Sequence, residues 1–238
     1  MIGLGTIINV IAIIAGGILG TFGKKLLSTS MQDGLLKANG LAVIFLGISG
    51  ALKEIFVLEN NQLSTQGTLM MIISLAVGTI IGEAFHFEEK FESFGTWLKK
   101  KTGNQEDDSF LNAFLTATFT VCIGAMAIVG AIQDGLNQGY ETLLLKGLLD
   151  FIIIMVMASS LGKGCIFSFI PVAIFQGLIT LLAQVISPIM TTQAISNLSL
   201  VGNILITCVG INLIWPKTIK VVNMLPAVLV AVIYAFFQ

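Results

Sequence analysis

Asp150 is the residue whose type and position most clearly suggest chemistry in this sequence. It lies in the apolar run Leu148-Leu149-Asp150-Phe151-Ile152-Ile153, several residues inside a segment long enough to cross a bilayer. A carboxylate inside a membrane costs several kcal/mol, so it usually faces the interior of a helix bundle or water. Asp150 is therefore a candidate for proton coupling or for binding a cation. The alternatives are that it turns outward to water, or that it pairs with Lys146 at i,i+4 spacing.

Side-chain amides inside other apolar runs form a second set of candidates. They are Asn9, Gln176, Asn203 and Asn212. Such groups most often form hydrogen bonds between neighbouring membrane helices. The functional alternative is that the four amides and Asp150 together line a polar path for a substrate or an ion.

Most enzyme and metal sites are excluded by residue type. Glu83 and His86 have the spacing of a metal-binding pair, but a two-metal centre in a helix bundle needs that motif twice, and His86 is the only histidine. The three cysteines, Cys122, Cys165 and Cys208, are widely spaced, which indicates packing rather than a disulfide or zinc site. There is no serine–histidine triad and no phosphate loop. We therefore expect no catalytic residue, no metal and no cofactor.

The elements that must position these residues are membrane-spanning helices. The chain is 55% hydrophobic and 11% charged, with a mean hydropathy of +0.96, whereas a soluble domain carries roughly 25% charged residues. Residues 1–238 are thus predicted to form one all-α, polytopic transmembrane helix bundle. The formal net charge of −1 provides no basic surface for a nucleic acid. We expect eight spans: Gly3–Phe22, Leu35–Leu52, Thr68–Ala84, Phe110–Ile132, Leu143–Leu161, Ile166–Ile186, Ile195–Trp215 and Val221–Phe237.

The lysines predict the orientation of these spans. The chain has no arginine, and the lysines concentrate in every second gap between apolar runs. They are Lys24, Lys25 and Lys37 around the first gap, Lys90 and Lys99–Lys101 in the third, Lys163 in the fifth, and Lys217 and Lys220 in the seventh, with only Lys53 and Lys146 in even gaps. Short basic loops stay in the cytoplasm, so the pattern predicts a bacterial inner-membrane protein with both termini outside the cytoplasm.

Prolines mark the least regular spans. Pro171 and Pro188 bracket the sixth span, and Pro226 lies in the short eighth span. Either span is a candidate for a broken or re-entrant helix, which is tolerated where protein or a water-filled cavity covers the backbone. A seven-span alternative would place the C-terminus inside the cytoplasm.

The one sizeable polar segment is residues 83–109. Phe87, Phe91 and Phe94 recur in it at helical spacing with Trp97 beside them, and charged residues occupy the other faces. This pattern predicts an amphipathic helix at the cytoplasmic interface with its aromatic side toward the membrane, followed by an acidic hinge. The alternative is that this segment only extends the third span into the cytosol.

A shift of about 80 residues aligns residues 42–83 with residues 122–163. Glu54 then matches Asp134, and Gly50 and Gly82 match Gly130 and Gly162, without a gap. A displacement by two spans preserves orientation, so the match predicts a parallel internal repeat.

Glycines line one face of each of the first three spans. They are Gly16, Gly17, Gly20, Gly47, Gly50, Gly78 and Gly82. Because lipid provides no hydrophobic drive for helix association, small residues let backbones approach closely. We therefore expect tight helix packing at these positions. The same faces are compatible with a homo-oligomer.

Several short motifs carry a resemblance to a known family. They are Asn9-Val10 through Gly16-Gly17-Ile18-Leu19-Gly20, Gly47-Ile48, and Gly78-Thr79-Ile80-Ile81-Gly82-Glu83 followed by acidic residues and Trp97-Leu98. In this span order the chain resembles the bacterial membrane family called domain of unknown function 554, the YqgA/YdfK-like proteins. The resemblance implies an integral inner-membrane protein and supplies no substrate or catalytic residue.

These observations predict a secondary transporter of a small solute or ion. The chain has no ATP-binding motif, so a proton or sodium gradient would supply the energy, with Asp150 as the coupling or cation site. One alternative is a passive channel. The other is a membrane sensor or assembly module that does not transport and acts through residues 83–109.

Overall fold

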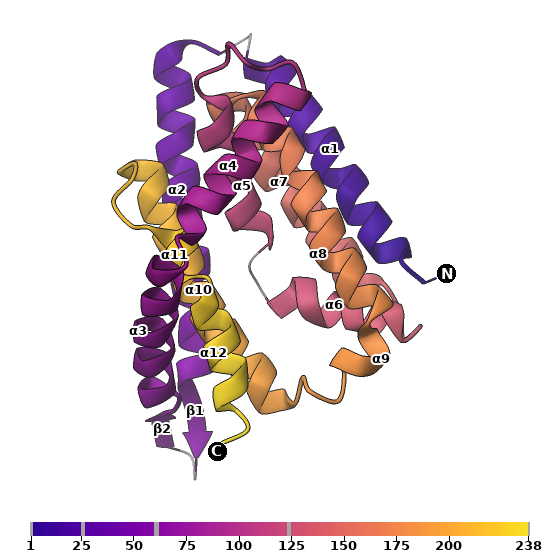
Figure 1. Ribbon diagram of the computed structural model, residues 1–238, viewed down its shortest axis with the longest axis vertical. Coiled ribbons are helices and arrows are strands. Elements are labelled where there is room, and N and C mark those ends of the chain that lie inside the picture. Colours follow the sequence, from indigo (N-terminus) through magenta and orange to yellow (C-terminus); the bar gives the residue numbers. More distant parts are fainter. Residues whose placement is uncertain (1, 25–26, 60–61, 123–124, 238) are drawn as a thin grey trace.

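The computed structural model describes residues 2–24, 27–59, 62–122 and 125–237, and it confirms the all-α class (Figure 1). The elements are α1 (Leu4–Lys24), α2 (Thr29–Ile55), β1 (Phe56–Glu59), β2 (Gln62–Thr65), α3 (Thr68–Ala84), α4 (Phe87–Lys101), α5 (Phe110–Cys122), α6 (Ala125–Gly135), α7 (Glu141–Leu161), the 3-10 helix η1 (Lys163–Ser168), α8 (Phe169–Leu181), α9 (Ala183–Ile186), α10 (Thr192–Ile214), α11 (Val221–Met224) and α12 (Pro226–Tyr234).

Several helices are long and apolar enough to cross a membrane. Five continuous segments meet this test: α1, α2, α7, α10 and the run Lys163–Leu181 through η1 and α8. Two further candidates are bent pairs, α3 with α4 at 59° and α5 with α6 at 64°. The last apolar segment, Val221–Tyr234, is shorter. The described residues thus contain five to seven candidate spans, and the choice between eight and seven spans stays a prediction.

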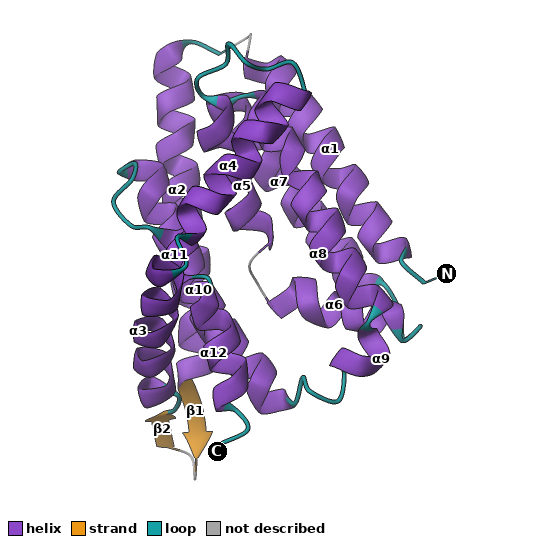
Figure 2. Cartoon of the chain, in the orientation of Figure 1, coloured by secondary structure: helices purple, strands orange, loops and turns teal. Residues whose placement is uncertain are grey.

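Two features differ from the expected elements. The sequence predicted one continuous span over Phe110–Ile132, whereas the structure divides this region into α5 and α6, with residues 123–124 outside the described part. The structure also contains a short antiparallel hairpin that the sequence pattern does not predict, in which Phe56 pairs with Thr65 and Glu59 with Gln62 (Figure 2). The hairpin has only four residues in each strand, which gives too short a pattern to stand out beside long apolar runs.

Glycines bring the backbones of three helix pairs together. A Cβ at Gly16 or Gly20 of α1 would overlap the carbonyls of Phe151 or Met155 on α7. The second span packs in the same way, because Gly47 and Gly50 lie against Asn203 on α10. In the third pair, Gly78 and Gly82 of α3 lie against the backbone of Ala227 in α12 and Asn223 in α11. Separately, Gly17 of α1 lies against Ile166 of η1. Small residues at these crossings permit close van der Waals contact in lipid.

Loops from three alternate gaps meet at one end of the bundle. The turn at Gly162 lies next to the Lys24 ammonium and Ser109, so the first, third and fifth gaps meet at one end. At the other end, Asp134 contacts the backbone at Gly3, and the N-terminus lies near α6 (Figure 1). Which end faces the cytoplasm stays a prediction.

Candidate functional site

Asp150 and Lys146 form a buried ion pair on α7. Their side chains lie one helical turn apart and are in direct contact, with only 4% of Asp150 and 7% of Lys146 exposed. This is the pairing that i,i+4 spacing allows, and it holds both charges inside the bundle. Two charges removed from water are stabilised only where geometry and further hydrogen bonds are good. The surroundings of Lys146 provide such a bond.

The Lys146 ammonium also binds the end of α5. It donates to the carbonyl oxygen of Val121 at 2.8 Å. Val121 lies in the last turn of α5, where carbonyls lack an intrahelical partner and carry the negative end of the helix dipole. The cation therefore stabilises the point at which α5 ends before α6 takes a different direction. Lys146 thus connects the Asp150 carboxylate to the end of α5.

Asn9 of α1 lies beside this pair and contacts Gln176 of α8. Both residues are fully buried, and the Asn9 Nδ2 donates to the Gln176 Oε1 at 3.3 Å. The Asn9 side chain is also beside the Asp150 carboxylate, and its backbone approaches α7 at Gly147. The Asn9 Oδ1 and the Gln176 Nε2 have no hydrogen-bond partner within the described part of the chain. The Asn9–Gln176 contact thus leaves one buried acceptor and one buried donor without a partner among the described residues.

A second buried carboxylate, Asp134, extends the polar region toward the start of α1. Its oxygens accept the backbone N–H groups of Gly3, Gly5 and Thr6 at 3.2, 3.0 and 3.4 Å. The first N–H groups of a helix lack intrahelical partners and attract negative charge, so Asp134 satisfies and anchors the N-terminus of α1. The sequence analysis did not select Asp134 as a site residue. The sequence signal for Asp134 was its match to Glu54 in the predicted repeat, which stays a prediction.

The two other predicted path residues lie elsewhere. Asn203 is on α10, where its Nδ2 donates to the Ser199 carbonyl at 2.8 Å and its side chain packs on Gly50. Asn212 holds the loop after α10, since its Oδ1 accepts the N–H groups of Thr218 and Ile219 at 3.1 and 3.0 Å. The structure therefore brings Asp150, Asn9 and Gln176 together and leaves Asn203 and Asn212 in local structural roles.

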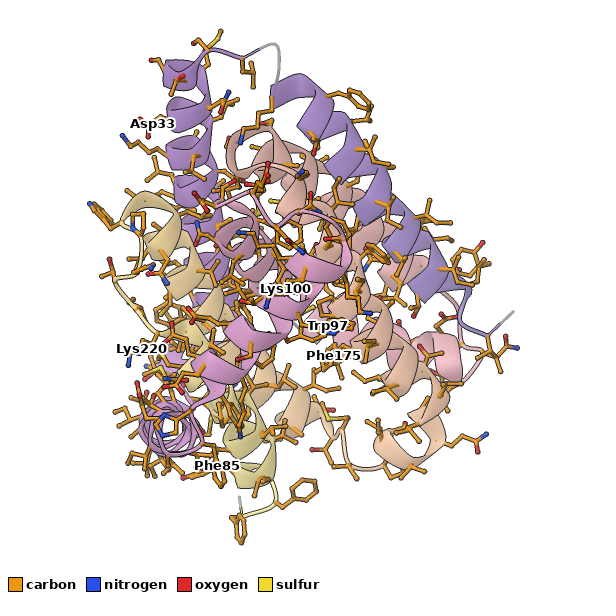
Figure 3. All side chains as sticks on the ribbon, turned by 45° about the horizontal axis from the view of Figure 1, so that its top comes forward. Asp33, Phe85, Trp97, Lys100, Phe175 and Lys220 are labelled. Carbon is orange, nitrogen blue, oxygen red and sulfur yellow. The ribbon has the colours of Figure 1, made fainter. Side chains whose placement is uncertain are left out.

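Helix α4 occupies the polar segment and lies across α5. Two of its aromatic side chains face the bundle: Phe91 is 5.5 Å from Phe119 and Phe94 is 6.0 Å from Phe114, between ring centroids. Trp97 stacks on Phe94 and is 52% exposed (Figure 3). Phe87 is half-buried. The aromatic side of α4 is thus shared between the bundle and the surroundings, and its place at a membrane surface stays a prediction.

The elbow between α3 and α4 is fixed by the segment after α10. The Asn223 Oδ1 accepts the N–H of Glu88 at 2.8 Å, and Lys220 lies 3.4 Å from the Glu83 carboxylate. His86 at the elbow faces solvent and lies 3.4 Å from Glu89. The described residues contain no group of three or more histidine, cysteine or acidic side chains that could hold a metal.

Comparisons with known proteins place the chain in one family. The model of the family described as "Protein of unknown function (DUF554)" matches residues 4–236. The uncharacterized membrane protein YdfK of Bacillus subtilis (strain 168) is 31% identical over 232 residues, covering 98% of this chain and 95% of YdfK. The uncharacterized protein YqgA of Escherichia coli (strain K12) is 28% identical over 235 residues, covering 96% and 94%. No solved structure matches the chain. Its apolar helices and these relatives identify a membrane protein with transmembrane helices, and the chain belongs to the DUF554 family.

Proposed function

We propose that the protein is a secondary transporter that moves a small solute or ion across the bacterial inner membrane. The observation that carries this proposal is the buried Lys146–Asp150 pair bound to the end of α5. Charged residues inside a membrane are rare and often belong to ion or proton pathways. Discontinuous helices at the depth of a buried polar site are typical of secondary transporters.

The proton is the coupling ion that the chemistry of the pair favours over sodium. The Lys146 ammonium already occupies the position beside Asp150 that a sodium ion would take. A proton instead neutralises the carboxylate and releases Lys146 from it, which weakens the attraction between the two side chains. Since Lys146 also holds the Val121 carbonyl, protonation of Asp150 changes the groups that position the end of α5.

The free amide groups supply contacts for a solute. The Asn9 Oδ1 accepts and the Gln176 Nε2 donates, so a small molecule that carries both kinds of hydrogen-bonding group would satisfy both. They come from α1 and α8, which pack against each other. In this proposal Asp150, Lys146, Asn9 and Gln176 form the transport site.

Transport is tested by current on a solid-supported membrane. Purified full-length protein in liposomes is screened with sodium, potassium, protons, amino acids, polyamines and small organic acids. We expect a solute-specific current that requires a proton gradient and that Asp150→Asn removes. The matched control is Asp33→Asn, because Asp33 and Lys37 form an i,i+4 ion pair of the same type on an exposed surface.

A second variant separates a coupling role from a folding role. Asp150→Asn leaves Lys146 buried without its counter-ion, so Lys146→Gln/Asp150→Asn, which removes both charges, is measured beside it. Unchanged proton coupling in either folded variant contradicts the proposal. A conductance that does not saturate as the solute concentration rises, and that is independent of the proton gradient, would indicate a passive channel instead.

The partner-binding alternative is supported by the exposed end of α4. Trp97 is half exposed there and Lys100 lies one turn away (Figure 3). If the folded protein gives no current with any solute, α4 becomes the functional surface to test. A stable partner in a mild-detergent pull-down, lost when Phe91 and Trp97 are made polar, would support this second function.

A further inference from the structure

A polar hollow of about 340 Å³ lies where α4 and α5 meet the end of α10 and the segment that follows it. Its volume is within the range of sites that bind small molecules, roughly 300–1,000 Å³. Buried apolar side chains form part of its wall: Phe119, Val209 and Val222 are 6%, 3% and 6% exposed. Asn112 and Thr116 of α5 add an amide and a hydroxyl. The hollow can therefore hold a small molecule that has both an apolar part and hydrogen-bonding groups.

Charged side chains of both signs line the rest of this hollow. Glu88 and Glu92 lie one turn apart on α4, and Lys217 and Lys220 come from the segment between α10 and α11. The formal charges of the two carboxylates and the two ammonium groups cancel. A small anion would meet the two carboxylates, and a small cation would meet the two ammonium groups. The lining therefore favours a ligand that carries a positive and a negative group on one molecule.

Three of these four charged groups have no ion-pair partner among the described residues. Lys220 lies 3.4 Å from the Glu83 carboxylate, which does not line the hollow (Figure 3 labels Lys220). The ion pairs of the described residues do not include Glu88, Glu92 or Lys217. Glu88 is half-buried, and the neighbouring Glu92 carboxylate repels it. An ammonium group between the two carboxylates would relieve this repulsion and donate charge-assisted hydrogen bonds.

The segment that carries the two lysines is held in place by α10. The Asn212 Oδ1 accepts the N–H groups of Thr218 and Ile219, and the Asn212 Nδ2 donates to the Ile219 carbonyl at 2.7 Å. Directly before these residues, Lys217 has a φ of +59°, in the left-handed region that favours glycine. Residues other than glycine that are held in this conformation cluster at functional sites. The backbone at this position therefore supports a role for the Lys217 charge.

We propose that this hollow binds a zwitterion, with its ammonium group at Glu88 and Glu92, its anionic group at Lys217, and an apolar part against the buried wall. Amino acids with apolar side chains have this chemistry, and so do phospholipids whose headgroup carries a primary amine. The hollow shares no described lining residue with the proposed transport site, and the inference does not depend on transport.

Binding to the full-length protein in nanodiscs tests the proposal in two arms. In the first arm the nanodiscs contain phosphatidylglycerol, which has no amine, and isothermal titration calorimetry measures the binding of leucine. The reference ligands are N-acetyl-leucine, which lacks the ammonium group, and leucinamide, which lacks the carboxylate. If the ligand is a free amino acid, we expect leucine to bind about tenfold more tightly than either reference.

The second arm tests a lipid headgroup as the source of the same chemistry. The nanodiscs contain equal amounts of phosphatidylethanolamine and phosphatidylcholine, and native mass spectrometry counts the lipids that stay bound to the released protein. The trimethylated nitrogen of phosphatidylcholine cannot donate a hydrogen bond to a carboxylate. If the ligand is a headgroup, we expect phosphatidylethanolamine to be retained about three- to tenfold more often.

Charge variants assign the preference found in either arm to this hollow. Glu88→Gln should lower the affinity for leucine about tenfold and leave that for N-acetyl-leucine unchanged, because only leucine has the ammonium group. Lys217→Gln should lower the affinity for leucine in the same way and leave that for leucinamide unchanged. In the lipid arm, both variants should remove the preference for phosphatidylethanolamine. Glu89→Gln is the matched control, because Glu89 is the next residue on α4 but lines other hollows.

Two results would overturn the proposal. One is the absence of a preference in both arms, which would show that the hollow does not recognise paired charges. The other is a preference that persists in Glu88→Gln and in Lys217→Gln, because the zwitterion would then bind elsewhere. Asp150→Asn should leave binding in both arms unchanged, so a failure of the transport proposal is distinguishable from a failure here.

Discussion

The helix pairs α1–α7 and α2–α10 use the same packing device but bury different polar groups. In each pair, glycines of the earlier helix lie against the later one: Gly16 on Phe151 in the first pair, and Gly50 on Asn203 in the second. The α1–α7 crossing contains Asn9 beside the Lys146–Asp150 pair, and the Asn9 Oδ1 has no partner among the described residues. Close packing alone therefore does not distinguish a functional crossing from a structural one.

The difference lies in how the polar groups are satisfied. At α2–α10, the Asn203 amide donates to Ser199 on its own helix, and the Thr207 hydroxyl donates to the Asn203 carbonyl at 3.0 Å. These bonds are local, so they stabilise α10 without requiring a partner. At α1–α7, the charges and amides depend on groups from α5 and α8. A site whose groups depend on four helices responds to movement of any of them.

The largest effect is expected from removing one member of the buried ion pair. Lys146→Met leaves the Asp150 carboxylate buried without a counter-ion, and breaking a buried pair in this way costs about 3–5 kcal/mol. We expect Lys146→Met/Asp150→Leu to recover most of this loss, because no uncompensated charge remains. Reversible unfolding in mixed micelles measures the free energy of unfolding of the single and the double variant. A double variant as unstable as the single one would show that Lys146 stabilises the bundle mainly through Val121.

A smaller effect is expected at Asp134 and Glu54, the two carboxylates that the predicted repeat aligns. Asp134→Ala removes a charged acceptor from three backbone N–H groups of α1 and should cost about 1.5–3 kcal/mol. Glu54 is half-buried, and among the described residues its Oε2 accepts one hydrogen bond, from the Ser196 hydroxyl at 2.7 Å, so Glu54→Ala should cost about 1 kcal/mol or less. The same unfolding measurement compares them. Equal losses would mean that the two carboxylates anchor α1 and α10 to the same extent.

The third prediction concerns the loss of stability when a glycine at either crossing is replaced by alanine. A methyl group at Gly16 would overlap the Phe151 backbone carbonyl, which cannot move independently of α7, so Gly16→Ala should cost about 1–3 kcal/mol. A methyl group at Gly50 would meet the end of the Asn203 side chain, which can change its rotamer. Gly50→Ala should therefore cost less. A larger loss for Gly50→Ala would indicate that the α2–α10 contact is the more rigid one.

The sequence predicted the regular helices well because their signals are local. The expected limits Thr68–Ala84 agree with α3, and α1, α7 and α10 agree within a few residues. Membrane helices satisfy their own backbone groups over about 20 apolar residues, so composition and length suffice. The division between α5 and α6 was not predicted, because part of what positions it is the Lys146 ammonium, 25 residues from Val121 along the chain.

The sequence by itself determined the membrane class and the family, and it offered the pairing of Asp150 with Lys146 as one of the alternatives for this carboxylate. That contact follows from i,i+4 spacing on one helix, which needs no knowledge of the fold. Only the tertiary structure decided which amides join it: Asn9 and Gln176 are 167 residues apart and meet because α1 packs against both α7 and α8. It also placed Asp134 at the start of α1 and left Asn203 and Asn212 to local bonds. An amide in an apolar run has the same sequence pattern in both roles, and only the partner brought near by packing separates them.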